Sequence, residues 1–254
     1  MNLLFNLLFL FFLCIYSADS ADPVYFICNG DSLPSRNIDA LLNKLVSGTV
    51  QNGFIATSYG VGKYQIYGLA QCRGDVSKAV CSVCIQDAAE NIRADCANQA
   101  DSRIWYDYCF LRYSTVKFFG DVDTSGLYLY NVENVTDPDV FNKKLGDLMD
   151  QISSEAVKPG SKGLGKGKKD ISSFVRLYAL VQCTRDLSNL NCAQCIAIAI
   201  GNFPTICADR KGCRVLYSSC YVRYELYPFF FPLGSQESLV DSLVNYKSVM
   251  ALKP

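Results

Sequence analysis

Histidine is absent from this chain of 254 residues. Its absence excludes serine–histidine and cysteine–histidine catalytic pairs, in which the imidazole activates the nucleophile. The remaining candidates for catalysis are carboxylate pairs such as Asp121/Asp123 and Asp137/Asp139, and these lie in turn-like segments that favour solvated acids. We therefore predict a protein that is not an enzyme and that needs no cofactor.

Excess charge and long apolar runs are also missing. The 24 lysines and arginines balance the 24 acidic residues, so no global attraction to nucleic acid or to an anionic membrane is expected. After residue 20, no apolar stretch approaches the roughly 18 residues that suggest a membrane-spanning helix. We predict neither a nucleic-acid partner nor a membrane span.

The first twenty residues differ from the rest. Residues 3–16 are apolar except for Asn6, which suits the core of a signal peptide and is too short to cross a bilayer. No lysine or arginine precedes this core, and a retained membrane anchor is the alternative. Small residues up to Ser20 favour cleavage there, so we predict a signal peptide at residues 1–20 and a secreted, extracellular protein.

Cysteine, by contrast, is abundant, and its positions repeat. Thirteen cysteines are present, and loss of Cys14 with the signal peptide leaves an even number, as expected of a disulfide-bonded secreted protein. Five cysteines recur with a constant offset of 111 residues, which indicates a module copied in tandem. The equivalent pairs are Cys72/Cys183, Cys81/Cys192, Cys84/Cys195, Cys96/Cys207 and Cys109/Cys220.

Two Cys-x-x-Cys spacings, Cys81/Cys84 and Cys192/Cys195, also occur in zinc and redox sites. A zinc site needs four convergent ligands with thiolates kept reduced. A secreted chain without histidine does not favour such a site, so we expect structural disulfides and no metal.

In the first copy, apolar residues at helical spacing predict a helix over residues 35–46, followed by a polar loop over 47–54. Residues 55–72 are typical of two strands about a glycine turn. A second helix is expected over 75–98, and the aromatic stretch 103–119 predicts a closing hairpin.

The second copy repeats this plan. Phe141, Leu145, Leu148 and Met149 form the face of its first helix. Residues 177–183 match a strand of the first copy, a second helix over 186–204 should end at Pro204, and residues 214–231 predict the closing hairpin.

The main difference between the copies is the Gly/Lys-rich segment 157–170, which we expect to be a loop before the first strand of the second copy. Its five lysines could bind an anion such as a cell-wall polyanion. A solvated flexible loop is the simpler interpretation, because no aromatic residue is interleaved.

Both copies combine helices with sequential hairpins and lack a βαβ pattern or a Gly-rich phosphate fingerprint. We predict an α+β fold made of a tandem pair of disulfide-stapled domains, each an antiparallel sheet of about five strands with two helices packed on one face. The expected domains span residues 21–126 and 127–234, with a C-terminal tail over 235–254. The aromatic stretches 117–121 and 227–232 form either an exposed patch or, as phenylalanine favours, buried core between the modules.

The cysteine spacing and its flanking residues resemble those of a plant family. C-x8-C-x2-C follows an aromatic-rich strand ending in Leu-x-Gln, and the second copy closes with RVLY-x-x-C-x-x-RYE-x-YPF. This pattern is similar to the ginkbilobin-homologous, salt-stress/antifungal domain. Two such domains after a signal peptide resemble the cysteine-rich repeat secretory proteins, which implies a secreted apoplastic protein of plant stress or defence.

The resemblance also implies a disulfide pairing. The pairs are Cys28–Cys96, Cys72–Cys81 and Cys84–Cys109 in the first copy, and Cys183–Cys192 and Cys195–Cys220 in the second. The second copy has no counterpart of Cys28, and Cys213 is the one cysteine left for Cys207. A Cys207–Cys213 disulfide is therefore expected.

Single-domain members of the family include an antifungal lectin whose mannose site uses an asparagine, an arginine and a glutamate. Those places fall on Asn29, Arg103 and Ser114 in the first copy, and on Asn131, Arg214 and Glu225 in the second. An arginine fork and a carboxylate suit adjacent sugar hydroxyls. Ser114 is a weaker substitute for a carboxylate, and Arg214 with Glu225 is equally typical of a cross-strand ion pair.

Two functions stay open at this point. The first is an extracellular interaction module that binds a receptor or another secreted protein, as the receptor ectodomains with the same tandem domains suggest. The second is a lectin that binds mannose-type glycans on fungi. Asn134 begins the only N-x-S/T sequon, so we also predict a glycoprotein with a glycan at that position.

Overall fold

The computed structural model describes residues 22–30, 35–231 and 246–251. The predicted signal peptide at residues 1–20 lies outside the described residues. The N-terminal domain, from β1 to β5, has two long helices and a five-stranded antiparallel sheet in the order β1-β4-β5-β3-β2. Its elements are β1 (Tyr25–Asn29), α2 (Ser35–Asn52), β2 (Phe54–Tyr59), the 3₁₀ turn η1 (Gly62–Tyr64), β3 (Ile66–Cys72), α3 (Lys78–Asp95), β4 (Asp101–Trp105) and β5 (Cys109–Ser114).

The C-terminal domain, from β6 to β11, repeats this architecture and adds one strand. Its antiparallel sheet has the order β11-β6-β9-β10-β8-β7. Its elements are β6 (Gly126–Asn131), α4 (Pro138–Ala156), β7 (Leu164–Asp170), β8 (Arg176–Cys183), α5 (Asn189–Gly201), α6 (Phe203–Ile206), β9 (Cys213–Tyr217), β10 (Cys220–Glu225) and β11 (Tyr246–Ala251). The predicted α+β pair of disulfide-stapled domains is therefore confirmed, with a connecting segment over residues 115–125 between them.

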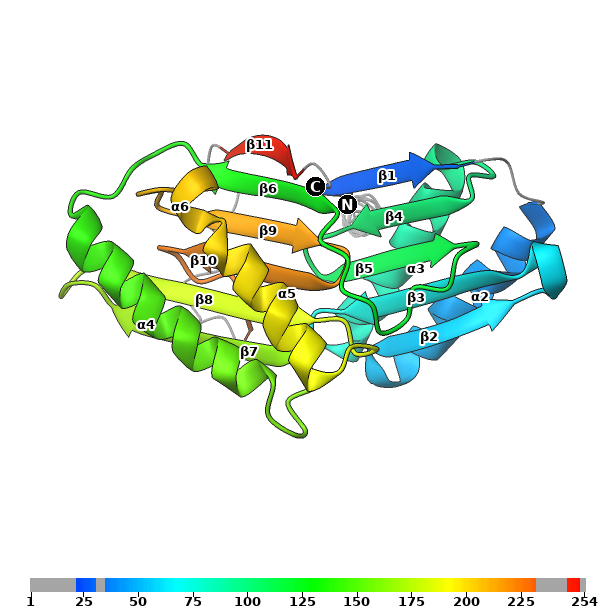
Figure 1. The fold of residues 1–254 in the computed structure, drawn as a ribbon, viewed down its shortest axis with the longest axis horizontal. Coiled ribbons are helices and arrows are strands. Elements are labelled where there is room, and N and C mark those ends of the chain that lie inside the picture. The colour runs from blue at the N-terminus through cyan, green and yellow to red at the C-terminus, as the bar shows by residue number, and fades with distance from the viewer. Residues whose placement is uncertain (1–21, 31–34, 232–245, 252–254) are drawn as a thin grey trace, which may run out of the picture.

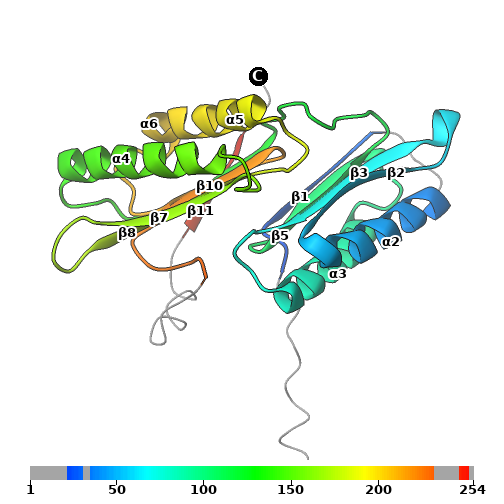
Figure 2. The ribbon, with the colours of Figure 1, turned by 90° about the horizontal axis from the view of Figure 1, so that it is seen from below.

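Each sheet buries one face under its own helices, and the two domains do so on opposite sides. In Figure 1, α4 and α5 lie in front of their sheet, whereas α2 and α3 lie behind theirs. Figure 2 shows the same arrangement from below, with one helical layer above and the other beneath. The predicted face of α4 is buried as expected, since Phe141, Leu145, Leu148 and Met149 belong to the core of the C-terminal domain.

The two domains contain six disulfides, of which five have the pairing that the family resemblance implies and the sixth, Cys207–Cys213, joins the two cysteines that remained. They are Cys28–Cys96, Cys72–Cys81, Cys84–Cys109, Cys183–Cys192, Cys195–Cys220 and Cys207–Cys213. Equivalent bridges in the two domains close loops of 9 and 25 residues. The remaining bridges differ, because Cys28–Cys96 spans 68 residues and Cys207–Cys213 spans only 6.

The loop predicted over residues 47–54 is wrong, because α2 continues to Asn52. Thr49 is fully buried, and its hydroxyl donates to the carbonyl oxygen of Leu45 at 2.6 Å. Gly48 lies close to β2, since a Cβ there would lie 2.2 Å from Cδ1 of Ile55 and that side chain would have to move. The small and polar residues that suggested a loop instead let the helix end lie close to β2.

The loop predicted over residues 157–170 is also wrong in its second half, which forms the edge strand β7. A Cβ on Gly165 would lie 1.9 Å from the carbonyl oxygen of Ile152 in α4. The glycines therefore permit a close helix–strand contact, and the lysines alternate with them along a real strand.

Two further expectations need correction. Pro204 does not end the second helix of the C-terminal domain; α5 ends at Gly201 and Pro204 lies in the first turn of α6. Proline is tolerated there because the first amides of a helix have no intrahelical partner. The tail predicted over residues 235–254 contains β11, which pairs with β6.

Candidate functional site

Part of the face that each sheet leaves free of helices is covered by a Phe-Phe pair from the segment that follows the closing hairpin. The guanidinium of Arg112 lies 4.0 Å from the ring centre of Phe118, and that of Arg223 lies 4.2 Å from the ring centre of Phe229. The two arginines are 111 residues apart in the sequence, and so are the two phenylalanines. Phe118 and Phe229 are buried. These two phenylalanines of the aromatic stretches therefore belong to buried core and not to an exposed patch.

These covering segments also join the two domains. The backbone N–H of Gly120 donates to Oδ2 of Asp186 at 2.9 Å. The backbone N–H of Phe231 donates to Oδ2 of Asp75 at 2.7 Å. Since donors and acceptors are again 111 residues apart, each domain binds the other through the same contact.

A reciprocal pair of glutamines completes the junction. Nε2 of Gln71 donates to the carbonyl oxygen of Cys183 at 2.8 Å, and Nε2 of Gln182 donates to that of Cys72 at 3.4 Å. Both carboxamide oxygens accept a backbone N–H of the opposite domain at 2.9 Å. The two domains therefore face each other across an approximate two-fold axis.

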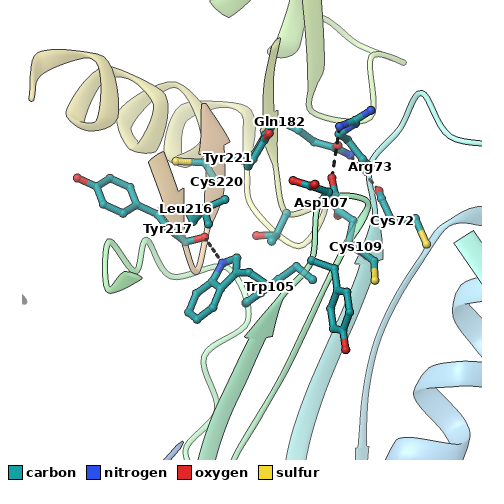
Figure 3. Close-up of a pocket in the computed structure, with 14 residues that line it drawn as sticks. Cys72, Arg73, Trp105, Asp107, Cys109, Gln182, Leu216, Tyr217, Cys220 and Tyr221 are labelled. Atoms are coloured by element: carbon teal, nitrogen blue, oxygen red, sulfur yellow. Dashed lines mark hydrogen bonds between the residues drawn. The ribbon is translucent and has the colours of Figure 1, made fainter. Parts of the chain in front are cut away.

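A small pocket lies at this junction (Figure 3), with a volume of about 50 Å³. On one side the indole N–H of Trp105 donates to the carbonyl oxygen of Tyr217 at 3.3 Å. On the other, the guanidinium of Arg73 donates to the carbonyl oxygen of Asp107 at 3.3 Å. Ligand pockets usually measure about 300–1,000 Å³, so this pocket is too small for a sugar ring, and none of the six candidate sugar residues lines it.

The candidates of the N-terminal domain lie on adjacent strands but in different surroundings. Asn29 is exposed at the end of β1 and lies opposite Asp101, which in turn lies opposite Ser114. Ser114 is buried, and its hydroxyl accepts the backbone N–H of Val116 at 3.2 Å. The register thus brings the asparagine and serine places to one end of the sheet, with a strand between them.

Arg103, the third candidate of that domain, is 5% exposed and fully engaged. Its guanidinium pairs with Asp101 at 3.0 Å and with Asp123 of the connecting segment at 2.8 Å. It also donates to the hydroxyl of Ser218 in the C-terminal domain at 2.7 Å. Burial acts to raise the pKa of Asp123, but Arg103 and a hydrogen bond from Ser125 outweigh it and lower that pKa.

Arg214 and Glu225 of the C-terminal domain do come together. Nε of Arg214 lies 3.6 Å from Oε1 of Glu225, and Nε of Arg223 lies 2.8 Å from the same oxygen. Glu225 is fully buried, and a Cβ on Gly212 would lie 2.0 Å from its Oε2. The carboxylate is therefore an internal partner of two arginines with no open path to a sugar.

Arg214 also reaches across the junction. Its Nη1 lies 2.6 Å from Oδ1 of Asp107 in the N-terminal domain. Burial acts to raise the pKa of Asp107, but Arg214, Arg223 and Arg73 outweigh it, so that pKa lies below its ordinary value. Arg103 and Arg214 thus both contact the opposite half of the molecule.

Asn131, the last candidate, is buried at the end of β6. Its side-chain oxygen accepts the backbone N–H of Glu133 at 2.9 Å, and its own backbone N–H donates to Gly212. Asn134, the sequon asparagine, is exposed on the same segment and forms a single bridge with Arg210.

The residues that join the domains were missed in the sequence, although a signal was present. Gln71 and Gln182 interrupt otherwise apolar strands at the same place in both copies, and Asp75 and Asp186 follow them four residues later. Polar residues repeated inside apolar strands at a fixed offset mark positions that both domains use in the same way.

The family model described as "Salt stress response/antifungal" matches residues 27–116 and 130–227. The chain belongs to this family. Its two copies match separately, in agreement with the 111-residue repeat.

Two curated relatives are similar to this chain over most of their length. Cysteine-rich repeat secretory protein 55 from Arabidopsis thaliana is 56% identical, covering 89% of this chain and 90% of that protein. An antimicrobial ginkbilobin-2-like protein from Castanea crenata is 41% identical, covering 85% of this chain and 92% of that protein. The chain is thus a member of a family of secretory, extracellular proteins.

Solved structures of the family show the same tandem arrangement. The tandem DUF26 ectodomain of the Arabidopsis thaliana cysteine-rich receptor-like protein PDLP8 aligns with a TM-score of 0.69 and 25% identity, covering 80% of this chain and 98% of that one. The corresponding ectodomain of PDLP5 aligns with a TM-score of 0.66 and 25% identity, covering 81% and 99%.

Of the helices in the described part of the chain, none combines the length and apolarity needed to cross a membrane. Within the same residues, no cluster of three or more cysteine and acidic side chains has the geometry to hold a metal ion.

Proposed function

We propose that this member of the family is a non-catalytic, secreted interaction protein of plant stress or defence, which binds a protein partner at the cell surface as one rigid double domain. The main observation behind the proposal is that Arg103 and Arg214 form contacts at the junction. Both arginines form ion pairs at the junction, so the positions that the family resemblance aligns with a mannose-binding arginine support contacts between the parts of the molecule.

A rigid unit presents its outer surfaces in a fixed relation, and preorganisation of this kind raises affinity for a partner that spans both domains. The receptor-like proteins PDLP5 and PDLP8 carry the same tandem unit as their ectodomain. That likeness supports an interaction role in which the double domain is the binding element.

Mannose recognition is the alternative. Asn29 is the one exposed candidate. Arg103, Ser114, Asn131 and Glu225 are buried, and the half-buried Arg214 would have to leave its ion pair with Asp107. Substituting Arg103 or Arg214 would disturb the junction whether or not sugar binds, so these variants do not discriminate. Asn29→Ala leaves the junction intact and tests the alternative cleanly.

The decisive experiment measures binding of the oxidised, fluorescently labelled protein to plant cell surfaces. We expect saturable binding that pretreatment of the cells with protease abolishes and that free mannose does not compete. Binding that mannose competes, and that Asn29→Ala weakens, would replace the interaction role with the lectin function.

We further propose that residues 1–20 are removed on secretion and that Asn134 carries a glycan. The exposed position of Asn134 supports modification there. Intact-mass and peptide mass spectrometry of the secreted protein should find an N-terminus at Ala21 and a mass decrease after enzymatic deglycosylation, which Asn134→Gln should prevent.

A further inference from the structure

A second, larger cleft lies between the domains, away from the six candidate sugar residues. Its volume is about 330 Å³, at the lower end of the range for small-ligand sites. One wall comes from the end of α2, the loop between β3 and α3 and the start of α3, and the other from the turn before β7 and Arg185 after β8. The cleft exists only because the two domains are joined.

The charge of this cleft is one-sided. Lys78 of the N-terminal domain and Lys162 and Arg185 of the C-terminal domain line it, and none of the lining residues is acidic. Arg73 also lines it, but its guanidinium is held by Asp75 at 2.6 Å. The other three cations form no ion pair with any carboxylate among the described residues.

Arg185 is the least compensated of the three. Its Nη1 donates to the carbonyl oxygen of Asn52 at 2.9 Å, and its guanidinium lies 5.7 Å from the ring centre of Phe54. Its Nε is buried without a hydrogen-bond acceptor in the described structure. Burial lowers the pKa of Arg185, which is the effect of removing a guanidinium from water without supplying a counter-charge.

Lys162 occupies an unusual backbone conformation. Its φ is +56°, in the left-handed region where glycine and asparagine are the residues normally tolerated. The turn before β7 therefore places a lysine at the cleft despite an unfavourable backbone, and such outliers are frequent at binding sites.

The remaining lining side chains suit a polyhydroxylated ligand. The carboxamide of Gln51 offers both donors and an acceptor. The side chains of Asn52 and Ser77 can donate, while their oxygens accept the backbone N–H groups of Phe54 and Val80. The hydroxyl of Ser161 lines the cleft but donates to Ala156 and accepts from Gly163. Sugar hydroxyls need this mixture, whereas the carboxylates of a peptide would need only donors. Val50, Val76 and Leu164 add apolar surface that can contact the carbon faces of a sugar ring.

From these observations we propose that the interdomain cleft binds a carboxylated oligosaccharide, with Lys78, Lys162 and Arg185 engaging the carboxylates of successive uronic acid units. This proposal goes beyond the proposed interaction role, and the site shares no residue with the candidate mannose sites. It assigns a function to one lysine of the Gly/Lys-rich segment.

The test is calorimetric titration of the oxidised full chain with a linear trimer of uronic acid at low salt. Neutral trihexose, inorganic phosphate and triglutamate are titrated in parallel. We expect the uronic acid trimer to bind, with an affinity that falls as salt is raised, and the other three probes to bind at least about tenfold more weakly.

Lys78→Gln combined with Lys162→Asn removes two charges from exposed side chains that make no described ion pair, and asparagine tolerates the left-handed backbone. This variant should weaken the trimer about tenfold. Lys168→Gln combined with Lys143→Gln is the matched control, because both lysines are exposed outside the cleft, and it should change the affinity less than about twofold. Arg185→Gln tests the third cation, with thermal unfolding as a check on folding.

Four results would overturn the proposal. They are no binding of the uronic acid trimer, equal binding of triglutamate, equal binding of phosphate, or equal loss in the cleft variant and the control. The last would identify non-specific attraction to lysine, and the phosphate result would identify a small-anion site.

Discussion

At the scale of single residues, the junction contains arginine–aspartate contacts that join a domain to the connecting segment or to the opposite domain. Asp123 accepts ion pairs from Arg103 at 2.8 Å and from Arg112 at 3.0 Å, and Asp107 pairs with Arg214. Asp123 therefore ties the connecting segment to β4 and β5.

These contacts predict acid sensitivity. The pKa values of Asp107 and Asp123 are both lowered from an ordinary value of 3.8. Their stabilisation is therefore fully present above that value and is lost as the pH falls through the lower folded-state pKa values. In urea unfolding, the contribution of these two groups to the free energy of unfolding should be constant above about pH 5 and should fall below about pH 4.

Asp123→Asn should lower the free energy of unfolding at neutral pH by about 2 kcal/mol, since it removes charge-assisted contacts to two buried arginines. It should also reduce the loss of stability between neutral pH and pH 3. Asp121→Asn, on the same segment but exposed, is the matched control and should change little. An unchanged acid profile in Asp123→Asn would contradict this account of the junction.

Phenylalanine burial gives a second prediction at this scale. Phe229 is 4% exposed and lies against Arg223, whereas Phe174 is 97% exposed at the tip of the β7–β8 hairpin. Phe229→Ala should reduce the free energy of unfolding by about 3 kcal/mol, and Phe174→Ala should change it by less than about 0.5 kcal/mol. Chemical denaturation of both variants makes the comparison, and similar losses would show that Phe229 does not cover the sheet.

At the scale of elements, glycine positions decide how closely helices approach strands. Gly165 of β7 lies under α4, where a Cβ would come within 1.9 Å of a backbone oxygen, while Gly146 in α4 itself has no atom within 4 Å of such a Cβ. Gly165→Ala should therefore destabilise the protein by about 2 kcal/mol or more through displacement of β7.

Gly146→Ala is the matched control and should stabilise the protein by about 0.5–1 kcal/mol, because alanine favours the helix interior. Thermal unfolding followed by far-ultraviolet circular dichroism measures both. Stabilisation by both substitutions would mean that β7 does not pack as closely as described.

The same glycines explain which elements could be predicted from the sequence. The hairpins β4–β5 and β9–β10 follow from aromatic, β-branched stretches, and the α4 face follows from Phe141 and Leu145 at helical spacing. Residues 47–52 and β7 could not be predicted, because Gly48 and Gly165 are typical of loops when only local propensity is considered. Both positions suit glycine because another element packs close to them in the folded protein, and that contact cannot be seen in the local sequence.

At the scale of the whole molecule, the 111-residue repeat predicts two similar domains but not how they face each other. Arg103, Ser114, Arg214 and Glu225 lie on strands of the predicted closing hairpins, and Arg214 does meet Glu225. Their burial depends on Asp107 and Asp123, which approach from the other domain and from the connecting segment. No local pattern encodes that approach.

The reciprocal glutamines predict cooperative behaviour of the two domains. Because Gln71 and Gln182 each bind the backbone of the opposite domain, the wild-type protein should unfold in one calorimetric transition, with a ratio of calorimetric to van't Hoff enthalpy of about 1. Gln71→Ala with Gln182→Ala should lower the midpoint and split the transition.

Gln65→Ala with Gln194→Ala is a suitable control pair, since both glutamines lie outside the junction and within one domain each. Two separate transitions in the wild-type protein would show that the domains unfold independently despite their contacts.

The contact between Asp75 and Phe231 has a consequence for synthesis. The two residues are 156 positions apart, and Arg73 binds the carbonyl oxygen of Phe229 across the same interval. At typical translation rates of about 5–20 residues per second, Arg73 and Asp75 are synthesised roughly 10–30 seconds before their partners Phe229 and Phe231. During that interval Arg73 and Asp75, whose side chains are both buried in the finished molecule, are exposed to water, because the residues that cover them have not yet been synthesised.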